Sequence, residues 1–166
     1  MASKKGIATT AIILAAITGA SFLLWIVPQD VKTTFVVADY ENYLDGVKNI
    51  HEVLEESIGI EYDNLRTGKI SPQDYVRVAE ATSSQVTTQI SEFVTSKPSE
   101  EWQTSYINYM DALKSFNSYI LETKVLANMI ENGNTEEEMD ETLERINMLK
   151  SESEEFVKMS DQSRPE

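Results

Sequence analysis

The fold is decided by residues 102–130, which read WQTSYINYMDALKSFNSYILETKVLANMI. Apolar and aromatic residues recur here at intervals of three and four, which is the period of one face of an α-helix. Pro98 precedes the stretch and Asn132-Gly133 follows it, as expected at the two ends of a helix. The sequence therefore predicts one long helix whose buried face consists of Trp102, Tyr106, Tyr109, Leu113, Phe116, Ile120, Ala127 and Ile130.

Three further segments repeat this spacing of apolar residues, and each is bounded by residues that favour helix ends. Ser71 and Thr135 stand where an N-cap is expected, and Gly68 follows the end of another segment. The segments are residues 36–65, residues 71–93 and residues 135–159.

Short loops between long helices force neighbouring helices to run antiparallel. We therefore expect an all-α fold, in which an antiparallel up-down four-helix bundle occupies residues 36–159. An apolar spacing close to 3.5 residues favours left-handed packing like that of a coiled coil. Residues 160–166 are expected to form a flexible tail.

Residues 6–27, GIATTAIILAAITGASFLLWIV, contain no charged side chain. At about 1.5 Å per residue they are long enough to cross a hydrocarbon core of about 30 Å. Lys4 and Lys5 precede this stretch, and every acidic residue follows it. The positive-inside rule then predicts a cytoplasmic N-terminus (residues 1–5), a single-pass transmembrane signal anchor and a linker over residues 28–35. The bundle is expected on the extracytoplasmic side of the cell membrane.

Two other interpretations of the N-terminus remain open. A signal peptide cleaved after Thr18-Gly19-Ala20 would leave the apolar residues 21–27 exposed on the product, so an uncleaved anchor is favoured. Lys4-Lys5-Gly6 followed by an apolar helix resembles the processing site of archaeal type IV pilin-like precursors. That resemblance implies a filament subunit, although pilin-like heads usually contain a β-sheet and this domain is predicted to be helical.

Small residues recur every fourth position within the anchor, at Ala11, Ala15 and Gly19. Such a stripe allows another membrane helix to approach closely, although Ala and Gly are also common in membrane helices without that role. Besides membrane lipid around the anchor, the sequence therefore predicts a membrane-protein partner or a homo-oligomer.

The composition excludes several kinds of function. With 28 acidic against 14 basic residues, the net charge is −14, so binding to nucleic acid is not expected. The chain has no Cys, which excludes disulfides, thiolate metal sites and Cys nucleophiles. His51 is the single histidine and is expected at the surface or half-buried on a helix. We expect no catalytic residues, no metal and no cofactor.

Tyrosines on the central predicted helix allow two interpretations. Tyr106, Tyr109 and Tyr119 fit the buried face, where their hydroxyl groups would reach its edge. The alternative is that they form a surface for a partner or ligand, and they are the candidate site residues of this domain.

The function expected from the sequence is that of a membrane-anchored extracytoplasmic interaction module. Such a module would be a non-catalytic accessory or structural subunit of a membrane complex. The predicted bundle also resembles the sensor domains of chemoreceptors and histidine kinases, which implies a ligand-binding ectodomain. It lacks their second membrane pass and cytoplasmic output domain, so it would act through a partner.

Overall fold

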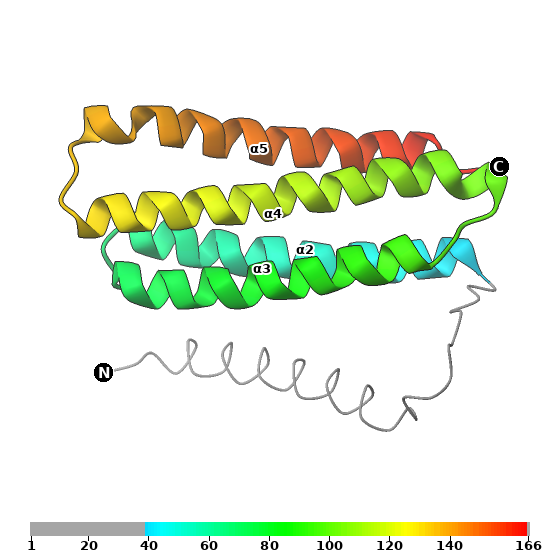
Figure 1. Cartoon of the computed structure of the whole chain (residues 1–166), viewed down its shortest axis with the longest axis horizontal. Helices are drawn as coiled ribbons and strands as arrows, with labels where there is room; N and C mark the ends of the chain where they lie inside the picture. The colour runs from blue at the N-terminus through cyan, green and yellow to red at the C-terminus, as the bar shows by residue number, and fades with distance from the viewer. Residues whose placement is uncertain (1–38, 166) are drawn as a thin grey trace, which may run out of the picture. The chain divides into compact units, whose positions relative to one another are not determined.

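A computed structural model describes residues 39–165, which fold into four long helices packed against one another (Figure 1). No strand occurs within these residues, so the predicted all-α class and the four helices are confirmed. A short 3-10 turn, Glu100–Trp102, leads into the third long helix. The long helices are α2 (Tyr40–Arg66), α3 (Pro72–Thr95), α4 (Gln103–Glu131) and α5 (Glu136–Gln162).

Side chains that satisfy free backbone N–H groups fix the starts of three helices. Asp39 accepts a hydrogen bond of 3.0 Å from the Asn42 N–H, so α2 begins at Tyr40, four residues later than predicted. Ser71 caps α3 in the predicted way. At the start of α5, the Glu138 carboxylate accepts a bond of 2.7 Å from the Thr135 N–H and completes the predicted capping box.

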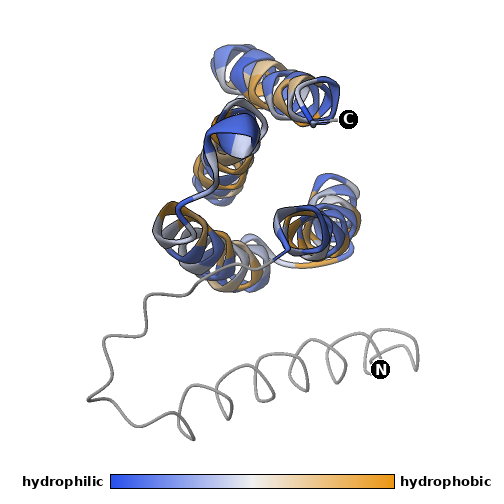
Figure 2. Cartoon of the chain, turned by 90° about the vertical axis from the view of Figure 1, so that its right-hand side faces the viewer, coloured by the Kyte–Doolittle hydropathy of each residue, from blue (hydrophilic) through white to orange (hydrophobic). Residues whose placement is uncertain are grey.

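Hydrogen bonds between helices show that each helix reverses the direction of the one before it. Tyr75 on α3 donates to the Thr123 hydroxyl on α4 over 2.7 Å, and the Ser105 hydroxyl on α4 donates to the Ser160 carbonyl on α5 over 2.9 Å. The closely packed pairs are α2–α3, α3–α4, α4–α5 and α2–α4. Figure 2 shows the helices end-on as an open arc, with α2 and α5 at its two ends.

The hydrophobic core agrees with the predicted apolar faces of α3 and α4 but differs on α2. Leu44 and His51 are buried there, whereas Ile50, an apolar residue at helical spacing within the segment 36–65, is 52% exposed. The buried face of α2 therefore follows the three- and four-residue steps through Val47, His51 and Leu54. His51 was expected at the surface or half-buried, and that expectation was wrong, because the side chain is 3% exposed.

The polar stretch 82–89 does not interrupt α3. Its hydroxyl groups bond to carbonyl oxygens one turn earlier, as Thr82 does to Val78 over 2.9 Å and Thr87 to Ser83 over 2.9 Å. Thr82 and Gln89 are themselves buried, so the inner face of this helix is partly polar.

Small residues allow α4 and α5 to approach closely. Ser105, Ala112 and Ser160 are fully buried where these helices meet, and Ser153 is nearly so. The Ser153 hydroxyl donates to the Ala112 carbonyl over 2.9 Å, and the Ser160 hydroxyl donates to the Ser105 carbonyl over 2.8 Å. We call these four residues the α4–α5 seam.

The last helix ends later than the boundary of the bundle that was predicted at residue 159. α5 continues to Gln162, because Ser160 belongs to the α4–α5 seam. Beyond the helix, the Arg164 guanidinium lies 2.7 Å from the Asp45 carboxylate on α2. The flexible tail predicted for residues 160–166 is therefore a packed helix end up to Gln162.

The predicted anchor lies outside residues 39–165, as do its stripe Ala11, Ala15 and Gly19 and the pilin-like motif. Among the helices that the structure describes, none is both long enough and apolar enough to cross a membrane.

We expect replacement of Gly59 by Ala to raise the free energy of unfolding by about 0.5–1 kcal/mol. Gly59 lies inside α2, and a Cβ atom added there would meet nothing within 4 Å. Urea unfolding monitored by circular dichroism measures the change. Gly68→Ala is the matched control, since Gly68 has φ +67° and an Ala there should destabilise the protein. A loss of stability in Gly59→Ala would contradict the open space around this position.

Candidate functional site

His51 is the centre of the candidate site. It projects from the buried face of α2 and is 3% exposed. Its Nδ1 atom lies 3.0 Å from the hydroxyl oxygen of Tyr109 on α4, and that side chain is 1% exposed. The Phe116 ring packs against the imidazole with ring centroids 4.5 Å apart.

The second ring nitrogen of His51 is buried without a partner. Nε2 has no hydrogen bond to any residue between 39 and 165. A buried polar atom without a partner costs about 1–3 kcal/mol of stability, so its position calls for a physical reason. Burial disfavours the charged imidazolium and lowers the pKa of His51 to about 4, so the ring is neutral at pH 7.

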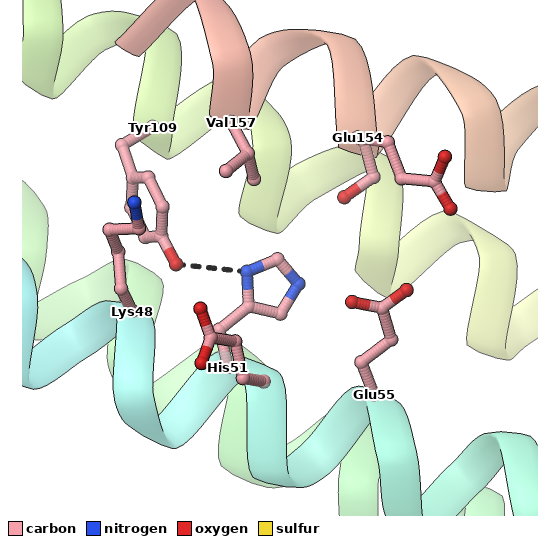
Figure 3. Close-up of a pocket in the computed structure, with 8 residues that line it drawn as sticks. Lys48, His51, Glu55, Tyr109, Glu154 and Val157 are labelled. Carbon is pink, nitrogen blue, oxygen red and sulfur yellow. Dashed lines mark hydrogen bonds between the residues drawn. The ribbon is translucent and has the colours of Figure 1, made fainter. Parts of the chain in front are cut away.

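A pocket of about 180 Å³ lies beside this nitrogen, between α2, α4 and α5. Figure 3 shows that Nε2 faces the side of the pocket on which Glu55 and Glu154 lie, while Nδ1 faces Tyr109. The pocket is lined by Lys48, His51, Glu52, Glu55, Tyr109, Ser153, Glu154 and Val157.

The charges around the pocket are mainly negative. Glu52, Glu55 and Glu154 contribute three carboxyl groups, and Lys48 contributes one ammonium group. The Lys48 Nζ atom lies 2.8 Å from both carboxylate oxygens of Asp161 and is engaged there.

The pKa of the Glu55 carboxyl group is raised. Burial is the main cause, and the neighbouring Glu154 and Glu52 add to it, while Lys150 opposes it. The local potential therefore favours a cation or a proton.

The chemistry of the pocket is that of hydrogen bonding and charge recognition. It presents a neutral imidazole, a phenol and three carboxyl groups, and the hydroxyl of the lining Ser153 donates to the Ala112 carbonyl. Within residues 39–165, no group of three His, Cys, Asp or Glu side chains is placed to hold a metal ion.

Tyr106, Tyr109 and Tyr119 were the candidate residues for a partner or ligand surface, with the buried face of the helix as the other interpretation. Tyr106, Tyr109 and Tyr119 are all buried in the core, so they do not form an exposed surface. Their spacing is that of the buried face of α4, so these tyrosines pack in the core. Tyr109 alone of the three lines the pocket, and a search for aromatic residues could not have separated it from the others.

A second candidate feature is an uncharged stripe along α2. Its members recur at intervals of three and four residues, so they share one side of the helix. Ile50, Val53 and Ile60 in this stripe are 52%, 64% and 52% exposed. The stripe, called the docking face below, consists of Gly46, Ile50, Val53, Ser57, Ile60 and Asn64.

Four long helices that pack in sequence order place the described residues in the class of all-helical bundles. Comparisons of the chain with protein-family models, with curated proteins and with solved structures gave no match. The pocket and the docking face are therefore interpreted from their own chemistry.

Proposed function

We propose that this chain is a membrane-anchored extracytoplasmic interaction module, a non-catalytic accessory or structural subunit of a membrane complex. Its docking face binds a helix of another membrane protein. The observation that carries this proposal is the presence of three exposed, large apolar side chains on an uncharged stripe of a strongly acidic protein.

Charge supports the docking face over other surfaces. With a net charge of −14, most of the protein surface repels another acidic protein and favours water. The docking face carries no ionisable side chain, and residues 81–91 of the neighbouring helix α3 also contain none. A partner can cover this area without burying unpaired charges, which would be costly.

The spacing of the docking face supports a helical partner. Its residues follow the heptad interval of positions that meet a second helix in a coiled coil. Gly46 and Ser57 are small and permit close approach, whereas the larger residues supply apolar area worth about 1.5–3 kcal/mol for each fully buried side chain. The partner should therefore present an uncharged, largely apolar helix face.

The anchor predicted over residues 6–27 supports the location of this partner. A chain held in the membrane at its N-terminus, with the bundle outside the cytoplasm, meets proteins of the same membrane at high effective concentration. The small-residue stripe Ala11, Ala15 and Gly19 would then contact the same partner within the bilayer.

The double substitution Ile50→Lys/Val53→Lys should abolish the complex. Both side chains are exposed, so the fold should persist while two charges enter the docking face. Native mass analysis of the full chain, extracted from its own membrane in mild detergent, should show discrete partners for the wild type and none for the double variant.

Ile107→Lys is the matched control, since Ile107 is an exposed isoleucine on α4, 53% exposed. This variant should keep the partner. A wild-type chain that is extracted alone or only as a homo-oligomer would refute the accessory role. Equal loss of the partner in both variants would refute the docking face.

A ligand-binding ectodomain is the second candidate function, and the pocket beside His51 favours it. Its buried, unpaired Nε2 atom is a polar group that a bound molecule would satisfy.

A further inference from the structure

We propose that the pocket between α2, α4 and α5 binds the primary ammonium group of a small organic molecule. In this arrangement the three N–H groups of the ammonium donate to His51 Nε2, to the Glu55 carboxylate and to the Glu154 carboxylate. The three acceptors come from two helices, α2 and α5, and the α4 residue Tyr109 orients the imidazole.

The pocket has a feature that a solvated acidic surface lacks. His51 is 97% removed from solvent, and its Nε2 atom faces the pocket without a partner among the described residues (Figure 3). Exposed carboxylates bind cations loosely wherever they gather, but a buried imidazole nitrogen adds a directional acceptor.

Tyr109 makes the required tautomer of His51 available. A phenol can donate or accept, and the 3.0 Å contact with Nδ1 fits either direction. When Tyr109 accepts from Nδ1–H, Nε2 presents its lone pair to the pocket and can accept a hydrogen bond from an ammonium group. Because burial keeps His51 neutral, this lone pair exists at pH 7.

The charge balance of the pocket favours a cation over an anion or a neutral ligand. Three carboxyl groups line it, the single lining ammonium group is already paired with Asp161, and the exposed Lys150 lies 4.0 Å from Glu154 outside the lining. A bound ammonium would relieve the mutual repulsion of these carboxylates. Charge-assisted hydrogen bonds of this kind are stronger than those between neutral groups.

The size of the pocket limits the ligand to a compact amine. About 180 Å³ accommodates an ammonium group and a short carbon chain. The partly buried Val157 provides an apolar contact for that chain. None of the lining residues belongs to the docking face, so amine binding and partner binding can each fail without the other.

Because His51 is the single histidine, its ring nitrogens give one pair of signals after histidine-selective ¹⁵N labelling of the full chain in detergent. Titration with n-propylammonium should shift the Nε2 signal saturably. The direction of the shift should be that of an Nε2 lone pair that accepts a hydrogen bond from the ammonium group. The quaternary analogue, N,N,N-trimethylpropylammonium, has the same charge but no N–H and should leave the signal in place.

Matched pairs of substitutions separate the named carboxylates from general negative charge. Glu55→Gln and Glu154→Gln should each weaken n-propylammonium binding by about tenfold, as expected for one charge-assisted hydrogen bond. Glu56→Gln and Glu155→Gln remove the same charge from the adjacent positions outside the pocket lining and should have little effect.

Four outcomes would overturn the proposal. Equal shifts with the primary and the quaternary ammonium ion would mean that the acidic surface attracts cations without a specific site. Equal weakening in the matched pairs of variants would mean the same. A signal that responds to Zn²⁺ but not to the amine would indicate a metal site instead. An Nε2 signal unchanged by every added cation would mean that Nε2 binds no cationic ligand and that His51 serves only in packing and in its contact with Tyr109.

Discussion

Replacement of Ser160 by Leu is expected to lower the free energy of unfolding by about 2–4 kcal/mol. Ser160 is fully buried in the α4–α5 seam and exchanges hydrogen bonds of 2.8 and 2.9 Å with Ser105. A leucine has no room there and would either separate the two helices or strain its own rotamer. The measurement is urea-induced unfolding followed by circular dichroism.

Two neighbouring variants serve as controls for this result. Ser160→Ala removes the hydroxyl without adding volume and should cost about 1 kcal/mol. Met159→Leu changes the adjacent side chain, which is 40% exposed, and should stay within about 0.5 kcal/mol of the wild type. A Ser160→Leu protein as stable as the wild type would mean that the end of α5 does not pack against α4.

Acidification from about pH 6.5 to about pH 4 is expected to remove about 3 kcal/mol of stability through His51 alone. Burial lowers the pKa of His51 from 6.5 to about 4 in the folded protein. Between these two pH values His51 is protonated in the unfolded chain but neutral in the folded protein. Proton binding therefore favours unfolding. Above pH 6.5 the ring is neutral in both states, and below about pH 4 both states are protonated, so the loss stops.

Other titratable groups near His51 also contribute to the pH dependence of stability, and their contribution must be distinguished from that of His51. Glu55 has a raised pKa, so it takes up its proton more readily in the folded state and opposes the loss as the pH falls. Glu52 and Lys48 on α2 and Glu154 on α5 also line the pocket.

The comparison that isolates His51 is with His51→Asn, whose amide can still accept from Tyr109 but does not titrate. Unfolding free energies of both proteins between pH 4 and pH 7.5 should converge at acid pH. A constant difference across this range would contradict the lowered pKa.

Periodicity predicted the four helices because the inner face of each one carries apolar residues at intervals of three and four. On α4 the expected residues between Tyr106 and Ala127 are all buried, and the buried face also includes Ala112, Ser115, Thr123 and Leu126, which were not expected. Caps at Ser71 and Thr135 also fell at the predicted residues, since their hydroxyl groups bond to the backbone within the same helical turn.

The errors arose where the buried residues are polar. In α5 the buried positions include Thr142, Ser153 and Ser160, and a search for apolar residues passes over them. Their burial depends on the close approach of α4, which is a tertiary property that the α5 sequence does not contain. The same limit applied to His51. One of the residues that bury it is Tyr109, which lies 58 residues further along the chain.

Only part of the pocket lining is close to His51 in the sequence. Glu52 and Glu55 lie within one turn of His51, but Glu154 and Val157 come from the last helix of the chain. No spacing rule connects these segments, because α2 and α5 are the first and the last of the long helices and come together only in the folded protein.

That arc also determines the order in which the protein can assemble during synthesis. Most of the helix packing joins helices that follow one another in the chain, so α2 and α3 can pair before α4 has left the ribosome. Each new helix then adds to a surface that already exists. The pocket cannot be complete before α5 has been synthesised, because Ser153, Glu154 and Val157 of its lining lie on that helix.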